Sequence, residues 1–152
     1  MTIVRIDTLD DPKVAEFRAA PDPALLRERG LFVAEGRFVI QALLQARRFR
    51  IRSLLLTEHT HLNLSDELDA AVVHDAPVYV ATSALFKDIG GYDFHRGYLA
   101  LAERQTPLEP RVLIEQAEAG RPLIVVERVG NPDNIGGIFR NAAAFGAAGV
   151  LL

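Results

Sequence analysis

The residues best placed to do chemistry form a loop and a helix within RPLIVVERVGNPDNIGGIFRNAAAFGAAGVLL, from Arg121 to Leu152. The pattern predicts a buried strand at LIVV, a polar loop GNPDN, a helix that contains the pair Gly136-Gly137, and a second strand. Free N–H groups at the start of such a helix can bind an anion, or Asn134 can cap them. This stretch is therefore a candidate functional site.

Arg140 is the candidate reactive group of that helix. At about 100° per residue, one apolar face collects the residues that we expect to pack on the sheet, namely Ile135, Ile138, Phe139, Ala142 and Phe145. Arg140 falls nearly opposite, among Gly136, Ala143 and Ala144. Small residues around one arginine favour a ligand pocket or a packed interface. The alternative is a surface arginine on an alanine-rich helix.

A second candidate is a run of arginines at a predicted helix end and into the next strand, made up of Arg47, Arg48, Arg50 and Arg52. Guanidinium groups can hold phosphates, and Phe49 could stack on a base. The alternative is a solvated helix end, because cations there suit the negative end of the helix dipole.

Two further features could contact a nucleic acid. His95 and Arg96 stand in the loop GGYDFHRG beside Tyr92 and Phe94, a mixture that can stack on bases and contact phosphate, although a structural loop is an alternative. Glu35 precedes Gly36 at the carboxyl end of a predicted strand, where ligands bind in open α/β sheets. Alternatively, Gly36 only permits a tight turn and Glu35 stabilises the following helix start.

The composition limits the chemistry. The chain has no cysteine, which excludes disulfides and thiolate metal sites, and His59 and His61 lack the spacing of a ligand pair on a helix. We therefore predict no metal site. No stretch resembles a signal peptide or a membrane span, so we expect a soluble, cytoplasmic protein.

Charge leaves nucleic-acid binding open. The net charge of −3 argues against indiscriminate binding to polyanions but does not exclude a local patch. Of the 17 basic residues only Lys13 and Lys87 are lysines, so the positive charge is carried by groups that fork to phosphate or stack on bases. Genome base composition could produce the same arginine bias.

Helical and strand patterns alternate along the chain. We predict helices over 12–20, 23–29, 36–48, 83–89 and 112–119 and from about Ser65, and strands over 31–34, 51–57, 77–81, 98–102 and at LIVV. Val39, Ile40, Leu43 and Leu44 should face inward. This alternation predicts an α/β fold with a mostly parallel or mixed sheet covered on both faces. The segment ERQTPLEP is the best interdomain linker.

The segment NPDNIGGIFRNAAAFGAAGVLL resembles the first signature motif of the SpoU (TrmH-like) branch of the SPOUT superfamily of RNA ribose methyltransferases. In that motif an asparagine is followed six residues later by an arginine, then by a small residue and Phe-Gly. The residues that match in register are Asn134, Arg140, Ala142, Phe145 and Gly146. The segments FVAEGRFVIQALLQARRFRIRSLLLTE and HRGYLAL also resemble the family's N-terminal domain, which is similar to ribosomal protein L30e and L7Ae folds.

The resemblance implies an L30e/L7Ae-like α/β/α domain that binds the RNA substrate over 1–105, a linker over 106–120, and the first βαβ unit of a trefoil-knotted, Rossmann-like methyltransferase domain over 121–152. It implies transfer of methyl from S-adenosylmethionine to a ribose 2′-hydroxyl of rRNA or tRNA, normally by a homodimer. Arg140 would be catalytic and Asn134 would support it. The expected RNA-binding residues are Glu35, Arg47, Arg48, Arg50, Arg52, His95 and Arg96.

The family's second and third motifs, a Gly-rich turn and a Ser-Leu-Asn segment, do not follow Gly149. We therefore expect this chain to be an N-terminal portion of a longer methyltransferase, without cofactor-binding residues of its own and unable to bind the methyl donor alone. Two other interpretations are an RNA-binding module of L30e/L7Ae type without catalysis and a Rossmann-type dinucleotide enzyme. The missing G-x-G-x-x-G spacing disfavours the last.

Overall fold

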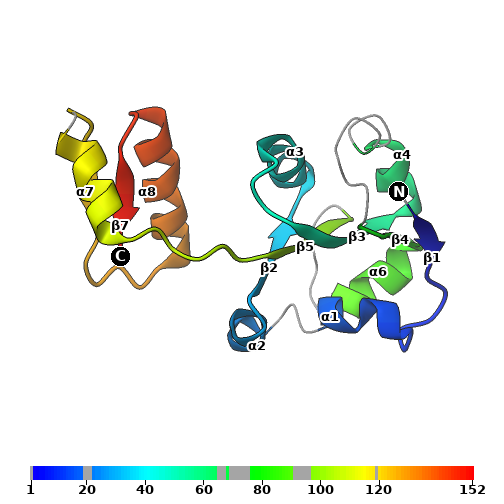
Figure 1. Ribbon diagram of the computed structural model, residues 1–152. Helices are drawn as coiled ribbons and strands as arrows, with labels where there is room; N and C mark the ends of the chain where they lie inside the picture. The colour runs from blue at the N-terminus through cyan, green and yellow to red at the C-terminus, as the bar shows by residue number, and fades with distance from the viewer. Residues whose placement is uncertain (1, 19–21, 65–67, 69–75, 91–96, 119) are drawn as a thin grey trace. The chain divides into compact units, whose positions relative to one another are not determined.

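The computed structural model describes residues 2–18, 22–64, 68, 76–90, 97–118 and 120–152. Two compact units make up the chain: unit 1, Met1–Gln105, and unit 2, Thr106–Leu152. The boundary between them lies within the segment ERQTPLEP. Figure 1 labels helices and strands of both units.

Unit 1 is built on a five-stranded sheet with the strand order β1-β4-β3-β5-β2. Its strands are β1 (Ile3–Arg5), β2 (Leu31–Glu35), β3 (Ile51–Thr57), β4 (Val78–Ala81) and β5 (Tyr98–Glu103). β1, β4 and β3 pair in parallel, whereas β5 is antiparallel to both β3 and β2. The predicted α/β class with a mixed sheet is confirmed. The short edge strand β1 was not predicted.

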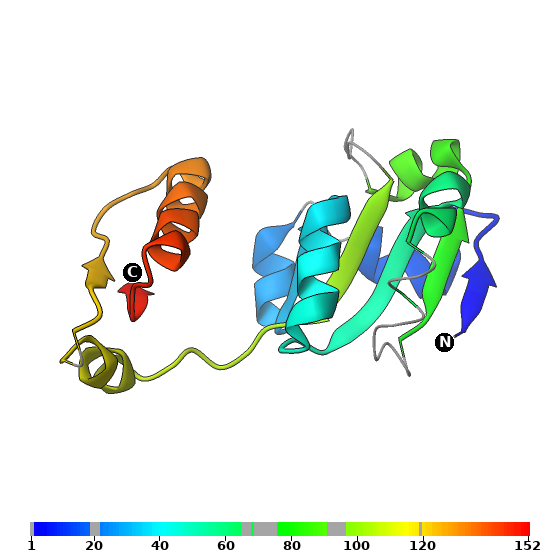
Figure 2. The same ribbon diagram turned by 90° about the horizontal axis from the view of Figure 1, so that it is seen from above.

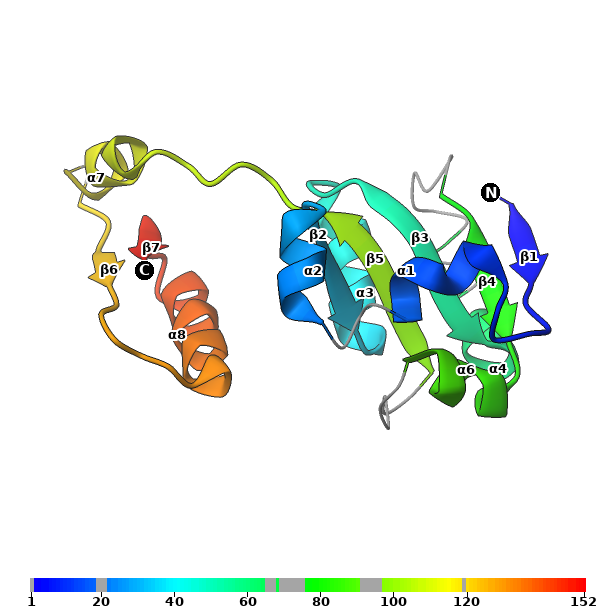
Figure 3. The ribbon, with the colours of Figure 1, turned by 90° about the horizontal axis from the view of Figure 1, so that it is seen from below.

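Helices cover both faces of this sheet. They are α1 (Ala15–Arg18), which follows a 3-10 turn over Pro12–Val14, α2 (Pro23–Glu28), α3 (Arg37–Ala46), α4 (Glu58–Leu62) and α6 (Ser83–Gly90). In Figure 1, α3 and α4 lie on one side of the sheet and α1, α2 and α6 on the other. Figure 2 shows α3 across β2 and β5, and Figure 3 shows α2 beside β2 on the opposite face.

The two faces carry separate hydrophobic cores because side chains alternate along each strand. Leu54 and Leu56 of β3 join one core with Ile40 of α3, whereas Leu55 joins the other with Phe17 of α1 and Phe86 of α6. A central strand that is buried on both faces reads as a continuous apolar run. This explains the sequence LLL in the middle of β3.

Local sequence signals explain where several helices begin and end. The Asp22 side chain accepts hydrogen bonds from the N–H groups of Ala24 and Leu25, both at 3.0 Å, and so caps α2. After α2, Gly30 adopts a positive φ of 68°, a conformation that glycine takes without strain. Asp11 caps the 3-10 turn that precedes α1.

Other expectations for unit 1 were wrong. Helix α3 ends at Ala46, two residues early, because Arg47 adopts the left-handed conformation with φ of 48°. Val39 is exposed, because the inward face of α3 is already formed by Ile40, Leu43 and Leu44. Helix α4 was missed; Thr57 and Thr60 cap its start reciprocally. The helix predicted from Ser65 lies outside the described residues, except for Leu68.

Unit 2 is one βαβ unit with a preceding helix. Its elements are α7 (Pro110–Glu118), β6 (Leu123–Val125), α8 (Pro132–Ala144) and β7 (Gly149–Leu151), and β6 pairs in parallel with β7. Gly149 lies against Leu113 of α7, so closely that a Cβ at this glycine would come within 2.7 Å of the Leu113 side chain. Glycine here therefore permits α7 to approach β7.

The apolar face predicted for α8 is only partly buried. Ala142 is buried and Ile135 and Ile138 are half-buried, but Phe139 and Phe145 are exposed. The prediction that the two phenylalanines pack on the sheet was wrong, because a two-stranded sheet offers too narrow a surface to cover the whole helix face.

Candidate active site and nucleic-acid interface

The start of α8 is capped by Asn131. Its side-chain oxygen accepts from the N–H groups of Asp133 at 2.8 Å and Asn134 at 3.4 Å, and its backbone carbonyl accepts from Ile135 N–H at 3.2 Å. Pro132, the first helical residue, has no N–H. The prediction that Asn134 caps this helix was wrong, and no N–H of the first turn is left for an anion. An asparagine directly before proline is the signal that would have found the cap.

The Arg140 guanidinium folds back over the Gly136-Gly137 pair. A Cβ built on Gly136 would lie 3.4 Å from Arg140 Nη1, and one on Gly137 would lie 3.9 Å from Nη2. Helical side chains lean toward the helix N-terminus, so residues three and four positions earlier form the surface beneath Arg140. The two glycines therefore leave a bare strip of backbone along which the guanidinium lies.

Arg140 is exposed, and within the described residues it has no hydrogen-bond or ion-pair partner. Its neighbours Ala143 and Ala144 are exposed as well and bear only methyl groups. An unpaired guanidinium has all five of its N–H donors available to an anionic or developing negative group. The geometry can thus stabilise negative charge on a bound molecule.

Asn134 makes no hydrogen bond to Arg140 within the described residues. The two stand six positions apart, which puts them about 120° apart around the helix. The Asn134 side chain is exposed. The two motif residues therefore share a helix but do not form a pair by themselves.

A hollow of about 380 Å³ opens beside the start of α8. It is lined by Val126, Arg128, Val129, Gly130, Ile135 and Leu152. This lining offers apolar surface and one cation, and none of its side chains is a carboxylate that could pair with an ammonium or sulfonium group. The described residues therefore do not fit a complete site for S-adenosylmethionine.

In unit 1 the structure gathers three of the four predicted arginines beside the end of β5. Nη1 of Arg50 lies 3.6 Å and Nη1 of Arg52 lies 3.5 Å from the same oxygen, Oε1 of Glu103. Arg48 Nε donates to Oε1 of Gln105 at 2.9 Å, and the Gln105 side chain donates to the Arg48 carbonyl. Arg47 is exposed and has no partner among the described residues. We call the four arginines, Arg47, Arg48, Arg50 and Arg52, the arginine cluster.

Phe49, considered above as a possible stacking partner for a base, is half-buried. Its ring packs edge-on against Phe32, with ring centroids 5.3 Å apart, and the Arg48 guanidinium lies 5.8 Å from its centroid. Phe49 therefore packs against the core beside Arg48.

The predicted RNA-binding residues are divided between the two ends of the sheet. At one end the Glu103 N–H donates to the Arg50 carbonyl, beside the arginine cluster. At the other end Glu35 pairs in register with Leu99, and the Gly36 N–H donates to the Tyr98 carbonyl. Glu35 is exposed there. His95 and Arg96, like Tyr92 and Phe94, lie outside the described residues.

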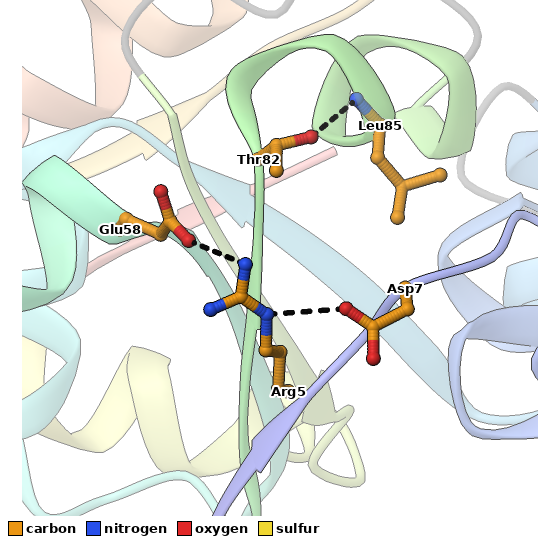
Figure 4. Close-up of polar contacts among 5 residues, drawn as sticks. All are labelled: Arg5, Asp7, Glu58, Thr82 and Leu85. Carbon is orange, nitrogen blue, oxygen red and sulfur yellow. Dashed lines mark hydrogen bonds and ion pairs between the residues drawn. The ribbon is translucent and has the colours of Figure 1, made fainter.

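Arg5 shows what a structural arginine looks like in this protein (Figure 4). Its Nε lies 3.1 Å from Asp7 Oδ1 and its Nη2 lies 3.1 Å from Glu58 Oε1, which ties the edge strand β1 to α4. In the same view the Leu85 N–H donates to the Thr82 hydroxyl at 3.3 Å, at the start of α6. Two carboxylates match the charge of Arg5, whereas none lies within ion-pair distance of Arg140 in the described chain.

The described residues bring together no group of three histidine, aspartate or glutamate side chains suited to a metal ion. His59, considered above as a ligand, instead has its Nε2 at 3.2 Å from the Asn63 amide nitrogen. None of the helices in the described ranges is long and apolar enough to cross a membrane.

The chain is similar to proteins that are named methyltransferases. No family model matches the chain. Proteins of Mycobacterium bovis and Mycobacterium tuberculosis, each named an uncharacterized tRNA/rRNA methyltransferase, are 34% identical to it over 147 residues, which covers 93% of this chain and 48% of each relative. The chain thus spans about half the length of the curated relatives it matches.

Solved structures share the fold. An AdoMet-bound rRNA methyltransferase from Sinorhizobium meliloti aligns with a TM-score of 0.70 at 20% identity, covering 97% of this chain and 53% of that one. An RNA 2′-O ribose methyltransferase aligns with a TM-score of 0.64 at 22% identity, covering 97% and 54%. A putative RNA methyltransferase of the TrmH family from Porphyromonas gingivalis aligns at 0.67 and 23%, covering 92% and 50%.

Proposed function

We propose that this chain, a relative of the SpoU (TrmH-like) RNA methyltransferases, forms part of an enzyme that transfers a methyl group from S-adenosylmethionine to a ribose 2′-hydroxyl of rRNA or tRNA. The observation that carries the proposal is the 34% identity to named tRNA/rRNA methyltransferases along 93% of the chain. Coverage of 48% of those relatives agrees with a portion of a longer protein.

Arg140 is the group that we propose to act on the RNA hydroxyl. A ribose hydroxyl is a weak nucleophile at neutral pH and must lose its proton as it attacks. A guanidinium stays protonated, so Arg140 would stabilise the developing alkoxide or an adjacent phosphate by donating hydrogen bonds. Its unpaired donors and the bare backbone beneath it support this role. Asn134, on the same helix, would orient the substrate.

S-adenosylmethionine, when bound, supplies the electrophilic methyl group. Because the hollow beside α8 lacks a carboxylate, we propose that the donor site is completed by residues beyond those described here. Such a site would form in a trefoil-knotted domain of the whole protein, and the proposed enzyme would act as a cytoplasmic homodimer.

Unit 1 is proposed to bind the RNA substrate as an L30e/L7Ae-like domain. Its five-stranded sheet with helices on both faces supports that assignment, and its exposed arginines and Glu35 supply polar contacts at the two ends. A module without catalysis is not favoured, because the relatives that match both units are named methyltransferases. The same relatives disfavour a dinucleotide enzyme.

The test is made on the whole protein, incubated with S-adenosylmethionine and unmodified rRNA or tRNA. Nuclease digestion and mass spectrometry of the nucleosides should reveal a 2′-O-methylated nucleoside, and it should be absent when the donor is omitted. Methylation confined to a base would contradict the ribose assignment, and no transfer to any RNA would contradict the function itself.

A further inference from the structure

A hollow of about 490 Å³ lies in unit 1 where β2 and β3 begin and β5 ends. Three arginines and two glutamates line it, namely Arg29, Arg52, Arg104, Glu16 and Glu103. The formal charge of this lining is therefore +1, the difference between three cations and two anions. We call it the β5-end cleft.

The backbone and the Arg104 side chain form a fixed wall of the cleft. The Arg104 N–H donates to the Gly30 carbonyl at 2.7 Å, and Arg104 Nε donates to the Leu31 carbonyl at 3.0 Å. Gly30 has no side chain, and a Cβ there would meet nothing within 4 Å. Arg104 is thus held by its Nε, while its terminal nitrogens remain unbonded among the described residues.

At the other wall Glu103 forms an ion pair with Arg52 that leaves N–H donors of the Arg52 guanidinium available. The ion-pair distances to Glu103 Oε1, 3.5 Å for Arg52 and 3.6 Å for Arg50, exceed ordinary charge-assisted hydrogen bonds. The Arg52 side chain is about half exposed, with a relative accessibility of 47%. A phosphate oxygen can therefore take up these N–H groups while Glu103 keeps both guanidinium groups close together.

We infer that the β5-end cleft binds a backbone phosphate of the RNA substrate, with Arg29, Arg52 and Arg104 as its donors and Glu103 as the residue that positions Arg52. The inference rests on the proposed function, since it names the part of the RNA that unit 1 holds. Guanidinium groups match phosphate oxygens in bidentate geometry.

The surroundings of the cleft favour a polyanion over a free phosphate. Positive charge continues outward from Arg52 to Arg50, whose side chain is 77% exposed, and Arg48 and Arg47 precede it in the chain. A series of exposed cations leading to an open cleft suits a backbone with successive phosphates.

The experiment compares Arg29→Ser and Arg52→Ser in the whole protein with a matched control, Arg27→Ser. Arg27 is an exposed arginine of the same short helix region, about 200° around the helix from Arg29, and it does not line the cleft. Fluorescence anisotropy with labelled substrate RNA should show about three- to tenfold weaker binding near 0.1 M salt for each cleft variant. The slope of log affinity against log salt should fall by roughly 0.7 to 0.9 per variant. Circular dichroism verifies that the variants fold.

The outcomes separate this inference from the proposed function. If both cleft variants match Arg27→Ser in affinity and salt slope while the wild-type protein methylates RNA, the cleft assignment is wrong. If the cleft variants lose RNA affinity but the wild-type protein methylates no RNA, the cleft is supported and the proposed function fails. If inorganic phosphate binds the wild-type protein and not Arg52→Ser, yet RNA affinity is unchanged, the site serves free phosphate and the inference is overturned.

Discussion

Arg140 in unit 2 and Arg52 in unit 1 both carry a guanidinium group, but only Arg52 has a carboxylate partner. Arg52 shares a carboxylate oxygen with Arg50, so its position is set by a partner and its charge is partly matched. Arg140 has no partner in the described chain, and its guanidinium lies beside Gly136 and Gly137, which carry no side chains. We therefore propose that unit 1 distributes RNA binding over several cations, whereas unit 2 relies on one.

The largest effect is therefore expected for Arg140→Ala in the whole protein. Methyl transfer should fall by about 100-fold or more, the scale of losing a donor that stabilises developing charge. RNA affinity should stay within a few fold, because the distributed arginines of unit 1 remain. Single-turnover assays at saturating RNA measure the rate, and wild-type turnover in this variant would rule out the catalytic role.

Replacing Arg47, Arg48 and Arg50 together with serine should weaken RNA binding without abolishing it. RNA affinity should weaken by about tenfold or more near 0.1 M salt, with a flatter salt dependence, while transfer at saturating RNA changes little. Arg18→Ser is the control, because that arginine pairs with Asp10 and lies outside the cluster. An unchanged slope of log affinity against log salt would show that these arginines do not bind RNA and belong to a solvated helix end.

Gly136→Ala tests whether bare backbone positions Arg140. The new Cβ would stand 3.4 Å from Nη1, at the edge of ordinary van der Waals contact, so we expect transfer to fall only slightly as the flexible guanidinium shifts. The same change should stabilise α8 by about 0.5–1 kcal/mol, since glycine weakens a helix interior.

Gly137→Ala is the matched control, because its Cβ would stand 3.9 Å from Nη2, an ordinary contact. It should bring a similar gain in thermal stability with a smaller change in rate. Equal rates for both variants and the wild-type protein would show that the glycine pair does not position Arg140.

The smallest effect separates the two asparagines of the motif region. Asn131→Ala should destabilise the protein by about 1 kcal/mol through loss of the helix cap, while Asn134→Ala should leave stability nearly unchanged. Urea denaturation measures both. A larger stability loss for Asn134→Ala would contradict the observed capping.

Prediction from the sequence succeeded where the physical signal is local. The helix predicted over 23–29 is α2, which begins at Pro23, and the strand predicted over 51–57 is β3 with the same bounds. The motif around Arg140 indicated a resemblance to RNA methyltransferases, and the curated relatives that match the chain are named tRNA/rRNA methyltransferases. These signals depend on neighbours a few residues apart.

Pairings between distant segments could not be predicted. Arg48 and Gln105 stand 57 residues apart and meet only through the pairing of β3 with β5. The division of Glu35 and the arginine cluster between opposite sheet ends depends on the same strand directions. The cap of α8 is a different case. Asn131 directly precedes Pro132, which is a local signal for a helix cap, but the prediction assigned the cap to Asn134.

One oxygen atom, Glu103 Oε1, serves both Arg50 and Arg52. Substitutions at these three positions should consequently show epistasis: once Glu103 is changed to glutamine, replacing either arginine should have a different effect on RNA binding than in the wild-type background. Among homologues, the same sharing should make the three positions covary as a triad, so that the loss of the carboxylate is accompanied by the loss or relocation of at least one arginine.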